Sequence, residues 1–168
     1  KISLDHNGLV LNFVSKINEL SIPTPENYSK KEVSDIVDSI EVRETVESDI
    51  QPNIVVIMSE AFWGFEKILP NYDGESYYPT VTKYKVGNIV SPTYGGGTSN
   101  VEFEALTGYS NSLLPDGSVP YQQYMSTYIP ALPNLLKEYG YETSAFHTYH
   151  KYFWNRMVAY PALGFDQF

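Results

Sequence analysis

The sequence predicts an α/β domain in which an open sheet carries helices on its faces. A strand, a helix and a second strand follow one another along the chain, which is the pattern of such a sheet. NIVVIMSE, residues 53–60, is a short continuous apolar run rich in β-branched residues, as in strands buried on both faces of a parallel sheet. LPNLLKEY, residues 132–139, has a proline near its start and Gly140 after its end, as a helix does, and YETSAFHTY, residues 141–149, has the pattern of a second strand. Ligands of open α/β sheets bind beyond the carboxyl ends of the strands, so we expect the functional residues there.

Residues 1–50 differ in character from the rest of the chain. They contain two prolines, a polar stretch and an acid-rich tract. Weak helical periodicity appears in two sets of apolar residues: Val10, Phe13, Val14 and Ile17, then Val33, Ile36, Val37 and Ile40. We interpret residues 1–50 as a helical lead-in or linker on the outside of the domain, and residues 51–168 as the domain itself.

Composition argues against several classes of protein. Eleven lysines and arginines against twenty aspartates and glutamates give a net charge of −9, which disfavours a nucleic-acid partner. The chain has no cysteine, so disulfides and thiolate metal sites are excluded. No apolar run approaches the roughly 20 residues that a membrane span needs. The sequence starts without methionine or a signal-like segment. We therefore expect a piece of a longer protein, with any membrane attachment outside this chain.

Glu60 stands at the carboxyl end of the first predicted strand, directly behind its apolar run. Burying a carboxylate is costly unless it is paired or bound to a metal ion. Glu60 is therefore a candidate metal ligand, and the alternative is a solvated glutamate in a loop.

The stretch GGGTSNVEFEALTG, residues 95–108, places three glycines ahead of a predicted helix. Ser99 and Glu102 have the spacing of a capping box, and Gly108 has the place of a helix terminator. Thr98 then lies at the start of the helix, where N–H groups and the helix dipole favour a negative group such as a phosphoryl group. In this interpretation the glycines let an anionic substrate approach Thr98 closely. Alternatively, the glycines only turn the chain, and Thr98 or Ser99 is an ordinary cap.

HTYHKYFWNR, residues 147–156, combines two imidazoles, several aromatic rings and an arginine just after the second predicted strand. An arginine can fork onto a phosphate, and a tryptophan can support a sugar or polyol face. Alternatively, Phe153 and Trp154 are core residues and His150 is a surface residue.

Four blocks in order, PNIVVIMSEAFW, GGGTSNVEFEALTG, LPNLLKEYGYETSAFH and FWNR, carry a family resemblance. From about residue 52 to residue 168 the chain resembles the extracellular catalytic domain of lipoteichoic acid synthase-like phosphoglycerol transferases, within the sulfatase and alkaline phosphatase superfamily. The resemblance implies an alkaline phosphatase/sulfatase-like sheet with helices on both faces, of which this chain holds the N-terminal portion. Residues 1–50 would connect it to a membrane-embedded region.

The resemblance also implies roles for five residues of this chain. Glu60 matches a metal-ligand carboxylate, and Thr98 matches a threonine that is both nucleophile and metal ligand. His147, Trp154 and Arg156 match positions that hold the phosphoglycerol headgroup. One divalent metal ion is implied, for which we expect Mn²⁺, with Mg²⁺ or Zn²⁺ as alternatives. A cation bound to the threonine oxygen activates it for attack on phosphorus.

The chain departs from the family pattern at two positions. Tyr149 stands where the family often has an acidic residue, which bears on glycerol specificity, and Asn100 stands where it often has aspartate. The family's remaining metal ligands, an Asp-His pair, come from beyond residue 168. We therefore expect the chain by itself to be inactive, to hold an incomplete metal site, and to be capable of self-association through exposed apolar surface.

The expected function is metal-dependent transfer of a phosphoglycerol-type headgroup from an anionic phospholipid to a cell-envelope glycopolymer, through a phospho-threonine at Thr98. The expected location is the cell membrane, with the catalytic domain outside the cell. One alternative is a phosphodiesterase or sulfatase-type hydrolase of the same fold. Another is a non-catalytic module that binds glycopolymer.

Overall fold

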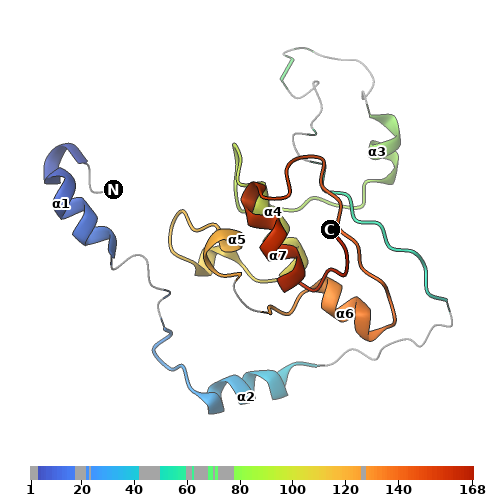
Figure 1. Cartoon of the computed structure of the whole chain (residues 1–168), viewed down its shortest axis with the longest axis horizontal. Coiled ribbons are helices and arrows are strands. Elements are labelled where there is room, and N and C mark those ends of the chain that lie inside the picture. The colour runs from blue at the N-terminus through green and yellow to red at the C-terminus, as the bar shows by residue number, and fades with distance from the viewer. Residues whose placement is uncertain are drawn as a thin grey trace. The chain divides into compact units, whose positions relative to one another are not determined.

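The structure is a computed structural model of the 168-residue chain. It describes residues 4–17, 22, 24–41, 50–59, 62, 68–69, 71, 78–125 and 128–168, whose course is drawn in colour in Figure 1. The chain divides into two compact units, one formed by residues 1–56 with 113–117 and the other by residues 57–112 with 118–168. The candidate functional residues within the described part all belong to the second unit.

Two helices of the first unit lie where the apolar periodicity predicts them. They are α1, Leu4–Ile17, which is interrupted at Gly8, and α2, Lys30–Ser39. α2 begins with a side-chain cap, because the Oγ of Ser29 accepts the Glu32 N–H at 3.1 Å. Among the described residues, no helix has the length and apolar character needed to cross a membrane.

The second unit is built from short helices (Figure 1). In chain order these are α3 Pro79–Tyr84, α4 Thr98–Thr107, α5 Pro120–Gln123, α6 Leu132–Glu138, η4 Phe153–Asn155 and α7 Arg156–Ala162, with η3 Asn111–Leu113 at the boundary between the units. α6 confirms the helix predicted over residues 132–139. It ends as expected, with Gly140 in the left-handed region at a φ of 81°.

A small apolar core holds the second unit together. α4 packs against α5 and α6, and α5 packs against α7. The buried apolar side chains are Phe103, Tyr121, Met125, Ala131, Ala159, Tyr160 and Leu163. Each large side chain in such a core stabilises the fold by roughly 1.5–3 kcal/mol. The core therefore connects α7 to α4 through α5.

The two strands predicted from the sequence are not formed by the described residues. Residues 53–59 adopt neither helix nor strand and are exposed to solvent. In residues 141–149 the strand pairing is limited to one parallel bridge, between Ser144 and Gln167. Beside this bridge, the Ala145 N–H donates to the Gln167 carbonyl at 2.9 Å. A strand exists only when a neighbouring strand takes up its N–H and C=O groups. The described part of the chain offers residues 53–59 no such neighbour.

A polar cluster fastens residues 141–145 to the C-terminal residues of the chain. Asp166 accepts both the backbone N–H and the hydroxyl of Thr143, each at 2.9 Å, and pairs with Lys137 at 2.5 Å. The hydrogen bond from Lys137, followed by the one from the Thr143 backbone, lowers the pKa of Asp166 to about 2. Asp166 is therefore charged at neutral pH and holds this end of the chain in place.

Candidate active site

Helix α4 begins directly after the three glycines, and Thr98 is its first residue. Gly95, Gly96 and Gly97 have φ values of 68°, 121° and 74°, which side-chain-bearing residues rarely adopt. The hydroxyl of Thr93 closes this turn by donating to the Gly96 carbonyl at 3.1 Å. A Cβ atom at Gly95 or Gly96 would have no heavy atom within 4 Å. The glycines therefore turn the chain, and open space lies beside two of them.

The capping box predicted at the start of α4 is wrong. The N-cap is Gly97, which has no side chain with which to cap the helix. Ser99 is fully buried, and its Oγ has no hydrogen-bond partner within the described part of the chain. The carboxylate of Glu102 instead accepts hydrogen bonds from Arg156. The alternative interpretation, that Thr98 or Ser99 is simply the cap, is wrong for the same reason.

Asn100 anchors the first turn of α4 to neighbouring loops. Its Nδ2 donates to the Ser118 carbonyl at 2.9 Å, and its own carbonyl accepts from Nδ2 of Asn111 at 2.8 Å. Asn100 is 8% exposed. Asn100, which stands where the family often has aspartate, therefore supports the helix that starts at Thr98.

A buried ion pair joins α4 to α7. The Arg156 Nε donates to Oε2 of Glu102 at 3.1 Å, and Nη2 of the same guanidinium donates to Oε1. Arg156 is 1% exposed and Glu102 is 8% exposed. Burial opposes the charge of Arg156, but the hydrogen bonds and negative charge of Glu102 outweigh it and raise the pKa of Arg156. Arg156 therefore keeps its charge inside the fold.

Two tyrosines complete the surroundings of this ion pair. The Tyr160 hydroxyl donates to Oε2 of Glu102 at 3.0 Å, and the Tyr121 ring stands edge-on to the Tyr160 ring at 6.1 Å. Burial, followed by the charge of Glu102, raises the pKa of Tyr160 to about 12 and also raises the pKa of Tyr121. Both phenols stay neutral at physiological pH, so Glu102 faces one cation and two neutral phenols.

The residues just before Arg156 form a left-handed turn. Trp154 and Asn155 have φ values of 56° and 59°, in a region that costs free energy for residues with side chains. Asn155 is held there by its Nδ2, which donates to the Tyr121 carbonyl at 2.7 Å. Arg156 Nη1 donates to the Phe153 carbonyl at 3.1 Å and closes the turn from the other side.

A hydrogen bond and two aromatic contacts connect His147 to Trp154. The Nδ1 of His147 accepts the Tyr149 N–H at 3.1 Å, so Nε2 is the ring nitrogen that is left to donate. The Tyr149 ring stands edge-on to Phe153 at 5.2 Å, and Phe153 lies 5.3 Å from the half-buried Trp154. The two predicted headgroup residues therefore belong to one loop, residues 147–154, which we call the aromatic loop.

The structure thus brings four of the five predicted site residues into one unit. Thr98 and Arg156 are connected through Glu102 of α4, and His147 and Trp154 are connected through the aromatic loop. Glu60 lies outside the described residues, so its predicted role is untested. Sequence reasoning missed Glu102, which it interpreted as part of a capping box. Its position one helical turn after Thr98, beside the apolar Phe103, could have suggested a buried partner.

The described residues do not form a metal site by themselves. Within the described ranges, no group of three or more His, Asp or Glu side chains could hold an ion. Thr98 is the one predicted metal ligand among these residues, and a single neutral hydroxyl is a poor ligand. A metal ion at Thr98 would therefore need ligands from outside the described residues.

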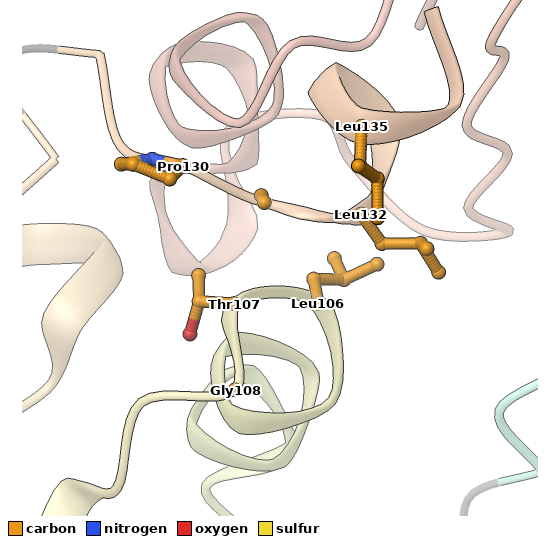
Figure 2. A pocket seen from close by; sticks show the side chains of 7 residues that line it. Leu106, Thr107, Gly108, Pro130, Leu132 and Leu135 are labelled. Carbon is orange, nitrogen blue, oxygen red and sulfur yellow. The ribbon is translucent and has the colours of Figure 1, made fainter. Parts of the chain in front are cut away.

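An apolar groove of about 400 Å³ lies between the end of α4 and the start of α6. Figure 2 shows Leu106 of α4 opposite Leu132 and Leu135 of α6. Thr107, Gly108, Pro130 and Ala131 complete its lining. None of the four predicted site residues that the structure describes lines this groove.

Comparison with known proteins shows the family. The sulfatase family profile matches residues 52–168. The chain belongs to the sulfatase family. An alkaline phosphatase/sulfatase-like fold follows for the domain, although the described residues contribute helices and a single bridge rather than a sheet.

Two curated proteins and one solved structure are similar to this sulfatase-family chain. A putative cyclic β-1,2-glucan modification protein from Rhizobium meliloti is 39% identical over 97% of this chain and 25% of its own length. A lipoteichoic acid synthase from Staphylococcus saprophyticus is 35% identical over 69% of this chain and 19% of its own length. The crystal structure of the lipoteichoic acid synthase LtaP from Listeria monocytogenes is 33% identical and covers 46% of this chain and 18% of its own, with a TM-score of 0.42. The chain thus spans a quarter or less of the curated relatives it matches and is lipoteichoic acid synthase-like in sequence.

Proposed function

We propose that the protein containing this chain transfers a phosphoglycerol-type headgroup from an anionic phospholipid to a hydroxyl of a cell-envelope glycan. The observation that carries the proposal is the start of α4, where Thr98 follows three left-handed glycines in a sulfatase-family chain. The similarity to a lipoteichoic acid synthase supports the headgroup, and the similarity to a putative glucan modification protein supports a glycan acceptor. We further propose that the reaction takes place at the outer face of the cell membrane.

Thr98 is the nucleophile in this proposal. Its Oγ attacks phosphorus of the lipid, the bond from phosphorus to the diacylglycerol oxygen breaks, and diacylglycerol leaves with the proton. Phosphoglycerol is then bonded to Thr98. The acceptor hydroxyl attacks the same phosphorus, its proton passes to Thr98 Oγ as that oxygen leaves, and the headgroup is bonded to the glycan. The start of α4 stabilises the negative charge in both steps because helix N-termini favour anions.

The aromatic loop holds the headgroup in this proposal. His147 presents an Nε2–H donor to an oxygen, since its Nδ1 is occupied by Tyr149. Trp154 offers an apolar face to the glycerol carbons. Arg156 would contact the phosphate through the N–H groups of Nη1 and Nη2 that remain after its bonds to Phe153 and Glu102. Because Arg156 is 1% exposed, this contact requires the side chains that cover the guanidinium to move when the headgroup binds.

A divalent metal ion, Mn²⁺ by our expectation, is also proposed, with Glu60 and Thr98 among its ligands. When bound, it would withdraw charge from the threonine oxygen and make that oxygen a better nucleophile.

The experiment is a single-turnover assay of the full-length protein with a phosphatidylglycerol labelled with ³²P. A stable label on the protein that requires Thr98 supports the proposal. Thr98→Ala should abolish labelling and reduce kcat by at least about 1,000-fold, while Thr98→Ser should retain part of both. Thr107→Ala, at the other end of the same helix, is the matched control and should leave both unchanged. Normal turnover by Thr98→Ala would overturn the proposed mechanism.

Hydrolysis is the second candidate because the matching family is the sulfatases. Water then replaces the glycan hydroxyl in the second step. Adding a cyclic β-glucan to the same assay distinguishes the two reactions. A transferase moves the label to the glucan, whereas a hydrolase releases free glycerol phosphate at the same rate with or without it. A non-catalytic glycan-binding module would show neither product.

A further inference from the structure

We propose that Glu102 is a positioning residue for the headgroup site. Its carboxylate orients the Arg156 guanidinium and thereby aligns the Trp154–Asn155 turn with the helix that begins at Thr98. This inference rests on the proposed function and adds to it a residue that touches neither the lipid nor the glycan.

The first support is the place of Glu102 on α4. Thr98 and Glu102 are four residues apart, so they lie on one face of the helix, separated by about 6 Å along its axis. α4 is a single helix from Thr98 to Thr107 and is anchored at its first turn by Asn100. Whatever Glu102 binds is therefore held at a fixed offset from the first residue of the helix.

The second support is the geometry of Arg156. Its Nε and Nη2 form a fork onto the two oxygens of Glu102, and this arrangement fixes the plane of the guanidinium. With that plane fixed, Nη1 reaches the Phe153 carbonyl and stabilises the left-handed turn at Trp154 and Asn155. Within the described part of the chain, Glu102 is the carboxylate that holds that plane.

The third support is the chemistry of the pair. Apolar side chains of the same volume often stabilise a fold as well as a buried ion pair does. A charged, forked pair is nevertheless found here, with a third hydrogen bond from Tyr160 to the same carboxylate. A forked pair differs from apolar packing in that it fixes orientation, and orientation is what a group next to a phosphate site requires.

The test compares three variants of the full-length protein, each assayed well below its own melting temperature. Glu102→Gln keeps the shape of the side chain and removes its charge. We expect about a 100-fold loss in kcat/KM for the anionic lipid, expressed mainly in KM, because misplacement by about 1 Å has an effect of that size. Tyr160→Phe removes one of the three hydrogen bonds to Glu102 and keeps the fork, so its loss should be much smaller.

Asp166→Asn is the matched control. It makes the same carboxylate-to-amide change in the same unit, in a cluster with Thr143 and Lys137 that does not include Arg156. It should lower the melting temperature and leave kcat and KM within about twofold of the unchanged protein.

A second readout is the ¹⁹F resonance of 5-fluorotryptophan at position 154, assigned by its loss in Trp154→Phe. This resonance should shift in Glu102→Gln and stay in place in Asp166→Asn.

The double variant Glu102→Gln/Arg156→Ala supplies the remaining check. If Glu102 acts through Arg156, the double variant is within about twofold of Arg156→Ala alone. Unchanged KM and an unchanged Trp154 resonance in Glu102→Gln would overturn the inference, as would full additivity in the double variant. If Thr98→Ala is fully active in the same assay, the proposed function itself fails. If Thr98→Ala is inactive and Glu102→Gln has normal kinetics, the positioning role alone is refuted.

Discussion

Replacing Glu102 by alanine should destabilise the protein severely, because it leaves Arg156 buried without its counter-charge. The carboxylate of Glu102 accepts three hydrogen bonds, two from Arg156 and one from Tyr160. Hydrogen bonds to charged groups contribute about 1.5–3 kcal/mol each, and breaking one partner of a buried pair costs about 3–5 kcal/mol in measured cases. The measured cost is smaller than the sum of three such hydrogen bonds, because the group that is left behind relaxes. We expect a loss of about 3–5 kcal/mol in the free energy of unfolding of the unit containing α4 and α7.

The assay is urea unfolding at neutral pH, monitored by fluorescence and circular dichroism together so that a non-two-state transition is detected. The comparison is the double variant Glu102→Leu/Arg156→Met, which removes both charges and fills the space with apolar side chains. Its free energy of unfolding should lie within about 1 kcal/mol of the unchanged protein. If Glu102→Ala costs less than about 1 kcal/mol, the ion pair is not buried as described and the reasoning is wrong.

Two further predictions concern the residues around this network. Gly97→Ala should lower the free energy of unfolding by about 1–2 kcal/mol and weaken activity, because its φ is 74° and a new Cβ would lie 3.3 Å from Thr93 Oγ1. Gly108→Ala, with a φ of 73° and open space around it, should lower the free energy of unfolding by about 1 kcal/mol. Equal losses for the two variants in thermal melts would contradict this argument. Asp166, whose pKa is lowered to about 2, stabilises the fold above its unfolded pKa near 3.8, and this contribution is lost as the pH falls toward 2. Melting temperatures of the unchanged protein should therefore fall more steeply between pH 5 and pH 2 than those of Asp166→Asn, while Glu142→Gln, at an exposed carboxylate nearby, should follow the unchanged protein.

Local sequence patterns were sufficient for α1, α2, α4 and α6, whereas α3, α5 and α7 were not predicted from them. The apolar spacing in residues 1–50 and in residues 132–139 predicts helices that the structure contains, and glycines mark the ends of α4 and α6. The start of α4 at Thr98 could also be predicted, because three consecutive glycines cannot easily continue a helix. These features depend on neighbours within a few residues, so the sequence alone determines them.

Tertiary structure decides which residues far apart in the chain bind one another. Ser99 and Glu102 have the spacing of a capping box, yet Glu102 binds Arg156, 54 residues away, because a buried guanidinium offers a carboxylate two charged donors in place of one backbone N–H. The apolar residues 53–59 have the composition of a strand, but a strand also needs a neighbour, which composition does not specify. The left-handed turn at Trp154 and Asn155 likewise exists because Tyr121 and Arg156 hold it. The sequence by itself thus determines that glycines end α4 and α6, because a terminator acts on its immediate neighbours. Tertiary packing decides which side chain orients Arg156, because that choice depends on burial and on charges brought together by the fold.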